Sequence, residues 1–315
     1  MSIDRNSEFG FAAPHDGPIP YLQRVRTYYQ ALGYGAPYEW AHYTEVPFHR
    51  LGKPLSACRV ALISTAAPYR PGQGEGAPYN ANAKFFTVYS ADATQDHDMR
   101  ISHVAIDRQH TTGEDQGSYF PLIKLRRAAA CGRIGSVAPR LHGLPTQRSH
   151  RVTLEVDCPE IAQRCEADAI DAAILLANCP VCHQTVSLAA RRLEQRGIAT
   201  VVMGCAKDIV ERVGVPRFLF SDFPLGNAAG RPNDPASQAL TLELALRLLE
   251  AAPAPRTTVQ SPLRWSASPD WKLDYCNVER LTPEEISRRR AEFDQAKVQA
   301  QRLRNEEQAA RRGPT

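Results

Sequence analysis

The segment NCPVCH at residues 178–183 holds the side chains best suited to chemistry. Two thiols separated by two residues can close a disulfide with little backbone movement, so the pair can carry two electrons. The pair follows the apolar run Ala172–Leu176, which indicates a buried strand, and Pro180 favours the first turn of a helix. We therefore expect Cys179 near a helix N-cap, where amide donors and the helix dipole favour a thiolate. On this basis Cys179 is the candidate attacking thiol and Cys182 the resolving thiol.

A zinc site is the alternative interpretation of this segment, because a Cys-x-x-Cys pair is also half of a common zinc-binding motif. The chain contains no second pair of this spacing. His183 and Cys205 could complete a set of four ligands with the two cysteines of the motif. A zinc-dependent hydrolase or lyase using Cys179, Cys182 and Cys205 is therefore kept beside the redox hypothesis. In that hypothesis an external dithiol or a thioredoxin-like protein is the reductant.

Cys205 follows a second apolar run, Ile198–Met203, and a third run lies at Arg217–Phe220. In an open parallel sheet, ligands bind at the carboxyl ends of the strands. Cys205 is therefore expected to share a crevice with the thiol pair and to act as a third catalytic thiol. Asp222 and Asn227 follow the third run and are expected to line the same crevice as substrate-binding residues.

A second polar cluster lies at residues 102–115. Met99–Ile106 is predicted to be a strand, and the alternation along Ile101–Ile106 places His103 on one of its faces, with a loop beyond it. Histidine and carboxylate groups near a reacting thiol suit general acid–base catalysis, and a hydrogen-bonded loop anchor explains the cluster equally well. The catalytic candidates of this cluster are His103, Asp107 and His110, and the substrate-binding candidates are Glu114 and Asp115.

The elements that must position these residues are strands and helices in alternation. In the second half of the chain, the apolar runs are separated by helical patterns at 185–196 and 207–213, which predicts parallel strands with right-handed crossovers. Earlier in the chain, Arg59–Ser64 indicates a buried strand that feeds a glycine- and proline-rich loop. Loops at this position commonly hold substrate, so Thr65 and Tyr69 are substrate-binding candidates.

We therefore predict an α/β fold with parallel-sheet, Rossmann-like lobes and an extended C-terminal helix. The helix is expected from the capping-box sequence Thr282–Glu285, with proline at the first helical position. Its sparse apolar positions are typical of a solvated arm that packs on the body or on a second subunit. The predicted divisions are a flexible N-terminus at 1–18, an N-terminal α/β lobe at 19–150, a C-terminal α/β lobe carrying the thiol pair at 151–255, and a linker with the long charged helix at 256–315.

Composition narrows the class of protein. The chain has 315 residues, of which 43% are hydrophobic and 23% charged, and this suits a globular protein with a well-buried core. The net charge of +4 is too weak to argue for nucleic-acid binding. The first residues lack the apolar run of a secretory signal, and no run approaches the roughly 18 residues of a membrane span, so we expect a cytoplasmic protein. In that reducing compartment, the eight cysteines are expected to be free, redox-active or metal-bound.

Three stretches of the sequence match the pattern of a known family: Val60–Thr65 with the glycine-rich loop after it, Ser102–Asp107 with Glu114–Asp115 and Phe120–Leu122, and Asn178–Cys182 with the helix to Gly197. Over roughly residues 55–250 the chain resembles the selenoprotein B family of the glycine, sarcosine, betaine and D-proline reductases. In the family, the third stretch holds selenocysteine-x-x-cysteine after a buried strand. Cys179 falls at the selenocysteine position and Cys182 at the position of its partner.

The resemblance implies reductive cleavage of an activated carbon–nitrogen or carbon–sulfur bond, with a dithiol as electron donor. In those enzymes the selenolate attacks the substrate carbon, the partner thiol regenerates it, and a separate subunit supplies a pyruvoyl group. Here a cysteine, which is a poorer nucleophile and leaving group, stands at the selenocysteine position. Expected partners are a small-molecule substrate, a redox partner protein, and further subunits of a homo-oligomer or a reductase complex. A non-catalytic subunit that docks through the C-terminal helix is the third hypothesis.

Overall fold

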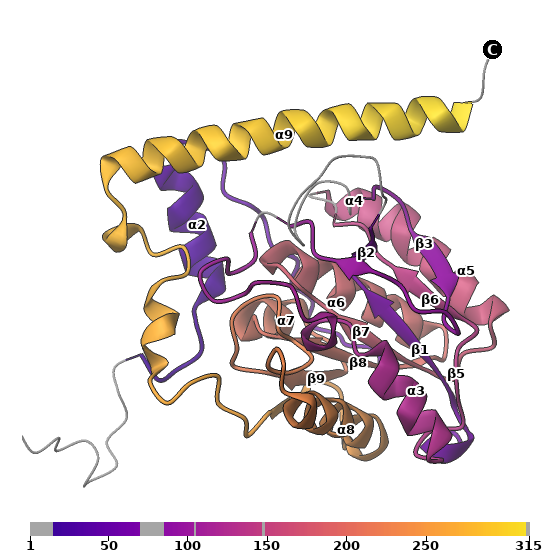
Figure 1. The fold of residues 1–315 in the computed structure, drawn as a ribbon. Coiled ribbons are helices and arrows are strands. Elements are labelled where there is room, and N and C mark those ends of the chain that lie inside the picture. Colours follow the sequence, from indigo (N-terminus) through magenta and orange to yellow (C-terminus); the bar gives the residue numbers. More distant parts are fainter. Residues whose placement is uncertain (1–14, 70–84, 104, 147–148, 313–315) are drawn as a thin grey trace, which may run out of the picture.

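The computed structural model describes residues 15–69, 85–103, 105–146 and 149–312, and its centre is an eight-stranded sheet (Figure 1). The strand order is β10-β9-β8-β7-β1-β6-β3, and β5 also pairs with β1. Strand β3 runs antiparallel to β6, whereas the other described pairings in this sheet are parallel. The strands are β1 (Arg59–Ser64), β3 (Tyr89–Asp92), β5 (Ser136–Val137), β6 (Arg140–Gly143), β7 (Ala172–Leu176), β8 (Ala199–Gly204), β9 (Arg217–Phe220) and β10 (Thr257–Gln260).

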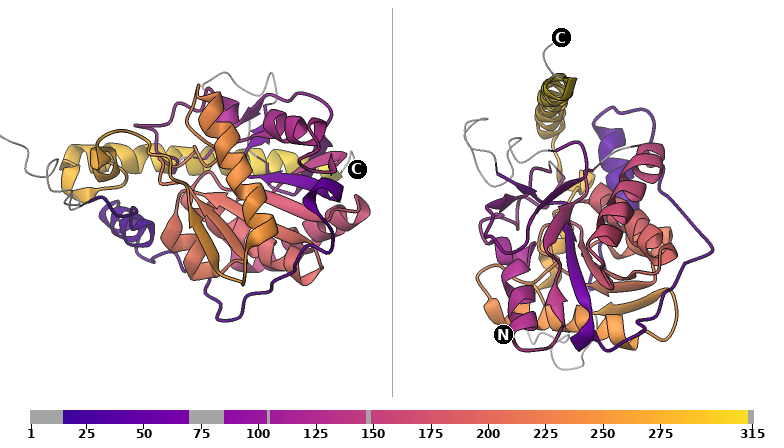
Figure 2. Two further views of the ribbon diagram at one scale, coloured as in Figure 1. Left: turned by 90° about the horizontal axis from the view of Figure 1, so that it is seen from below. Right: turned by 90° about the vertical axis from the view of Figure 1, so that its right-hand side faces the viewer.

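The central strands form where the sequence has continuous apolar runs. Every residue of β7 and of β8 is buried, as expected for strands that are covered by helices on both faces. The helices are α2 (Tyr21–Ala31), α3 (Leu122–Ala130), α4 (His150–Val152), α5 (Cys158–Ala167), α6 (Pro180–Gln195), α7 (Lys207–Val213), α8 (Pro235–Ala251) and α9 (Pro283–Arg312). Helices α5, α6 and α7 pack side by side on one face of the sheet, and α3 and α8 cover the other (Figure 2). The predicted α/β fold with a mostly parallel sheet is confirmed.

One sheet takes strands from both sides of the predicted boundary at residue 150. Strand β1 pairs with β6 on one side and with β7 on the other, so residues 59–143 and 172–260 share a continuous hydrogen-bonded ladder. The division of the chain into two lobes stays a prediction. Residues 1–14 of the predicted flexible N-terminus, and the glycine-rich loop at 71–78, lie outside the described residues.

The strand predicted at Met99–Ile106 is confirmed only over its first two residues. A two-residue strand, β4 (Met99–Arg100), pairs with β2 (Ala67–Pro68) and ends before His103. The chain then leaves the extended conformation because its polar groups are used elsewhere: the amide of Asp107 donates to the carbonyl of Leu225 at 3.2 Å. His103 therefore reaches the centre of the molecule from a loop.

Helix α9 begins at the predicted capping box. The Thr282 amide donates to Oε2 of Glu285 at 3.0 Å, and the Glu285 amide donates to Oγ1 of Thr282 at 3.2 Å. Near its start, Phe293 packs edge-on against the rings of Tyr29 and Tyr34, and the helix then runs past the body of the protein (Figure 1). None of the described helices is long and apolar enough to span a membrane.

Candidate functional site

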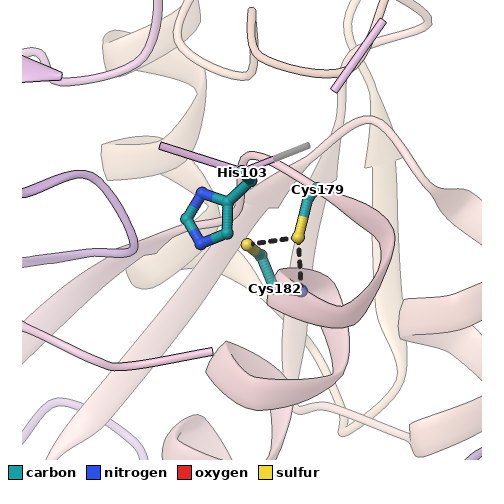
Figure 3. A group of neighbouring side chains, drawn as sticks. All are labelled: His103, Cys179 and Cys182. Carbon is teal, nitrogen blue, oxygen red and sulfur yellow. Dashed lines mark hydrogen bonds between the residues drawn. The ribbon is translucent and has the colours of Figure 1, made fainter. Parts of the chain in front are cut away.

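The thiol pair lies at the N-terminus of α6, directly after β7. Cys179 is the N-cap residue, as expected, and its Sγ accepts the amide proton of Cys182 at 3.3 Å. The two Sγ atoms lie 2.7 Å apart, and both residues are free cysteines (Figure 3). Only 3% of Cys179 and none of Cys182 is exposed to solvent. The strand-to-helix junction thus buries two thiols in contact at the carboxyl end of the sheet.

Two side chains from outside α6 contact the Cys182 side of the pair. Oγ1 of Thr146, in the segment after β6, lies 3.2 Å from Sγ of Cys182. The same oxygen lies 2.8 Å from Nε2 of His103. Figure 3 shows the imidazole of His103 beside the sulfur of Cys182, with Cys179 on the far side. His103, Thr146 and Cys182 therefore form a chain of hydrogen-bonding side chains that ends at the Cys182 sulfur.

The environments of the two thiols shift their pKa values in opposite directions. Burial, then the hydrogen bond and charge of Cys182, raise the pKa of Cys179 well above its ordinary value. Burial also acts to raise the pKa of Cys182, but the Cys179 thiol, the His103 charge and hydrogen bond, and the Thr146 hydroxyl together lower it well below that value. Of the two thiols, Cys182 is therefore the more acidic. The helix-cap argument had favoured Cys179, because it did not include the two donors from outside the helix.

His183 links the thiol segment to the end of β8. Its Nε2 accepts the amide protons of Cys205 at 2.8 Å and Ala206 at 3.1 Å, so Nδ1 carries the ring proton and donates to the carbonyl of Cys179 at 2.7 Å. Burial lowers the pKa of His183 to about 4, so the ring is neutral at pH 7. A Cβ at Gly204 would lie 2.6 Å from the ring, so glycine is needed for this close approach.

A zinc site of the expected composition is not assembled among the described residues. Both nitrogens of His183 are used by backbone groups. The ligand atoms of His103, Cys179 and Cys182 do lie within 4.8 Å of one another, but Cys205 is not part of this group. The two sulfurs are 2.7 Å apart, about 1 Å closer than two thiolates bound tetrahedrally to zinc at about 2.3 Å. The separation is nearer to the roughly 2.05 Å of a disulfide bond than to that of two zinc-bound thiolates.

The side chain of Cys205 faces away from the other two thiols. It packs in a separate apolar cluster with Tyr21 and Phe223, whereas Cys179 and Cys182 belong to the main core. Burial raises the pKa of the Cys205 thiol, and backbone amides of the loop after β9 partly offset this shift. The backbone of Cys205 does approach the pair through His183. The structure therefore brings its main chain, but not its sulfur, to the thiol segment.

Asp107 and His110 have polar contacts with other parts of the chain. Asp107 is buried, and burial raises its pKa to about 6. His110 lies 2.9 Å from Oδ2 of Asp274, in the segment before α9. No described hydrogen bond joins either residue to the thiol pair. Of the three catalytic candidates in this cluster, His103 is the one that the structure brings to the thiols.

Thr65 lies beside the thiol segment. Its Oγ1, at the end of β1, accepts the Asn178 amide proton at 3.3 Å and the Asn178 side-chain Nδ2 proton at 3.1 Å. It thereby orients the residue that precedes Cys179.

The other substrate-binding candidates contact different elements. The ring of Tyr69 lies under the Arg100 guanidinium at 3.9 Å, and Glu114 is exposed. Asp115, Asp222 and Asn227 bond to Gln238, Lys272 and Thr111 respectively.

Sequence reasoning missed Thr146. The residue has no neighbouring motif, and its contact with Cys182 arises because β6 and β7 flank β1 in the sheet. A hydroxyl three residues after a short strand carries no signal of its own. His183 was noticed only as a candidate zinc ligand, although its place one residue after Cys182 already put it in the first turns of α6.

Comparisons with known proteins support a distant relationship. The chain is similar to D-proline reductase subunit gamma of Acetoanaerobium sticklandii, with 28% identity over 217 residues, which cover 68% of this chain and 88% of that subunit. No family model matches the chain, and no solved structure matches it. The chain is thus a distant relative of the reductase family that its sequence resembles.

Proposed function

We propose that this chain is a thiol-dependent oxidoreductase that cleaves a carbon–nitrogen or carbon–sulfur bond of a small molecule reductively. The observation that carries the proposal is the buried contact of 2.7 Å between Cys179 Sγ and Cys182 Sγ at the N-terminus of α6. A pair at this separation can exchange a proton and can close a disulfide with a small movement. The relative named above is a reductase subunit, so we also propose that the chain works as one subunit of a cytoplasmic reductase complex.

The proposed reaction begins with a proton transfer within the pair. Cys179 gives its proton to Cys182. The amide of Cys182, which already donates to Sγ of Cys179, stabilises the Cys179 thiolate that forms. This thiolate attacks the activated substrate carbon, a carbon–sulfur bond forms, and the amine or thiol leaves with the bonding electron pair and takes up a proton.

The second half of the reaction releases the substrate carbon. Cys182 gives up the proton that it received and attacks Sγ of Cys179, a disulfide forms, and the carbon leaves as a stabilised carbanion that takes up a proton. The two cysteines are oxidised to one disulfide and supply two electrons to the substrate bond; one of the two protons comes from the thiol pair and the other from solvent. An external dithiol or a thioredoxin-like protein then reduces the disulfide. His103 supplies proton transfer beside Cys182, and Thr65 orients the segment that carries Cys179.

A redox titration of the full chain tests this proposal. Peptide mapping by mass spectrometry should show one disulfide, between Cys179 and Cys182, that forms and is reduced reversibly by dithiothreitol. The reduced protein is then screened with amines and thioethers, and loss of turnover in Cys179→Ala is the expected result. The matched control is Cys131→Ala, because Cys131 is exposed and lies outside the site.

Two results would contradict the proposal. The first is a wild-type chain that forms no disulfide between Cys179 and Cys182 at any dithiothreitol ratio. The second is stoichiometric zinc in protein purified without chelator that is lost in Cys179→Ser, which would favour the zinc-dependent alternative.

A further inference from the structure

Thr146 joins His103 to the thiol pair through its hydroxyl group. Its Oγ1 lies 2.8 Å from Nε2 of His103 and 3.2 Å from Sγ of Cys182, and both separations suit hydrogen bonds. A threonine hydroxyl has one proton to donate and can accept another at the same time. It can therefore donate to one of these neighbours while it accepts from the other.

The chain of hydrogen bonds can run in two directions. In one direction the Cys182 thiol donates to Oγ1 and the hydroxyl donates to Nε2. In the other, Nε2–H donates to Oγ1 and the hydroxyl donates to a Cys182 thiolate. The two states differ by a shift of two protons, from Sγ to Oγ1 and from Oγ1 to Nε2. This shift leaves Thr146 neutral, makes Cys182 a thiolate and makes His103 an imidazolium, without any change in oxidation state.

The environment of His103 permits this change of direction. Its Nδ1 is buried and has no hydrogen-bond partner within the described parts of the chain. No carbonyl or carboxylate there fixes the tautomer of the ring, so Nε2 can be an acceptor or a donor. The same ring can therefore take a proton at Nε2 and pass it on, which is what the resolving step needs.

We propose that Thr146 is a further catalytic residue that passes the Cys182 proton to His103 when Cys182 attacks the intermediate on Cys179. The proposal rests on the function proposed above and assigns the proton of its second step. Cys182 loses its proton through Oγ1, attacks Sγ of Cys179, and expels the substrate carbon. The proton on His103 is then available to the carbanion, so no outside acid or base is consumed.

The direct approach of His103 to Cys182 is the competing route for the proton. The two side chains also interact with each other, and the ligand atoms of this group lie within 4.8 Å. Thr146→Val keeps the shape and removes the hydroxyl, whereas Thr146→Ser keeps the hydroxyl. The described titratable groups that face Cys182 are Cys179, His103 and His183, and all three are present in both variants.

The test measures the resolving step without a substrate. Cys179 in the full chain is converted to a mixed disulfide with methyl methanethiosulfonate. Closure of the Cys179–Cys182 disulfide is then followed between pH 5 and 9 by acid quenching and peptide mapping. We expect a closure rate that is nearly independent of pH in wild type. In Thr146→Val it should fall by about 100-fold near pH 6 and recover as pH rises, because general acid–base groups contribute about this much or more.

Two further variants make the test specific. Thr146→Ser should stay within roughly threefold of wild type, as expected for a hydroxyl that carries the proton. Thr146→Val combined with His103→Gln should be no slower than either single variant, because residues of one proton path are not additive.

The outcomes separate the two proposals. If wild type closes the disulfide and Thr146→Val has the same pH profile, the proton passes directly and the role of Thr146 is refuted. If Thr146→Val and Thr146→Ser slow closure equally at every pH, Thr146 is only structural and the inference also fails. If wild type itself closes no disulfide between Cys179 and Cys182, it is the proposed function that fails.

Discussion

Two histidines flank the same thiol pair, and they differ in what holds their ring nitrogens. His183 has both nitrogens bonded to backbone groups of α6 and of the segment after β8. His103 uses Nε2 on Thr146, and its Nδ1 has no partner in the described residues. A ring with two fixed partners cannot change its protonation without breaking bonds, so His183 holds the site together. A ring with one fixed partner can exchange a proton, so the comparison assigns chemistry to the His103 side.

The largest expected effect is on stability, and it separates the two histidines. His183→Ala leaves a cavity, two buried amides and one carbonyl without partners, and should lower the free energy of unfolding by roughly 3–5 kcal/mol. His103→Ala removes a hydrogen bond to Thr146 and one to Cys182, and should cost about 1 kcal/mol for each. Urea denaturation of both variants at pH 7 measures the difference. Equal losses in the two variants would show that the additional hydrogen bonds of His183 do not add to the free energy of unfolding.

Acidification should reveal the buried neutral ring of His183. Its pKa is about 4 in the folded protein, and an unfolded histidine titrates near 6.5, so between these pH values the unfolded chain binds the proton and the folded chain does not. The stability contributed by the neutral ring is complete above about pH 6.5 and is lost as pH falls toward 4, with a total of roughly 3 kcal/mol.

His183→Gln provides the comparison for this pH effect. The variant should be less stable than wild type at pH 7, and the gap should narrow as pH falls, because glutamine has no proton to take up. Chemical denaturation at pH 4.5, 5.5 and 7 gives the two curves. His142 also has a pKa of about 4, and it is present in both proteins, so its contribution cancels in the difference. Parallel curves would mean that His183 takes up a proton in the folded state over the same pH range as in the unfolded chain.

The sequence predicted the α6 side of the site, which holds Cys179 and His183, better than the side of His103 and Thr146. The apolar run of β7 and Pro180 were sufficient to place Cys179 at a helix N-cap, because both signals are local. The contact of Thr146 with Cys182 depends on the order of β6, β1 and β7 in the sheet, which no local pattern specifies. The strand predicted at 99–106 forms only over Met99–Arg100, and further along the chain the Asp107 amide bonds to Leu225 in a loop.

Gly204→Ala tests the close packing that keeps His183 in place. The added Cβ would lie 2.6 Å from Cδ2 and 2.7 Å from Nε2 of His183, so the ring has to move away from the amides of Cys205 and Ala206. Overpacking of this kind costs about 1–3 kcal/mol. We expect a lower urea midpoint with an unchanged slope. The control is Gly52→Ala, at a glycine that, like Gly204, has no positive φ and that has no neighbour within 4 Å of an added Cβ. A loss no larger than in the control would show that the ring can move without cost.

Cys205→Ser should have the smallest effect. It tests whether a residue placed at the carboxyl end of a strand also brings its side chain to the site. The rule that ligands bind at the carboxyl ends of parallel strands correctly places Cys205 at the end of β8, beside the amides that His183 holds, but it does not specify where the side chain points. Because its sulfur packs with Tyr21 and Phe223, the variant should shift the midpoint potential of the Cys179–Cys182 disulfide by less than about 30 mV, which corresponds to about 1.4 kcal/mol. Redox titration with peptide mapping measures this shift. A disulfide between Cys205 and either member of the pair in wild type would instead make Cys205 a third redox thiol, and the His183 side of the site would then take part in the chemistry.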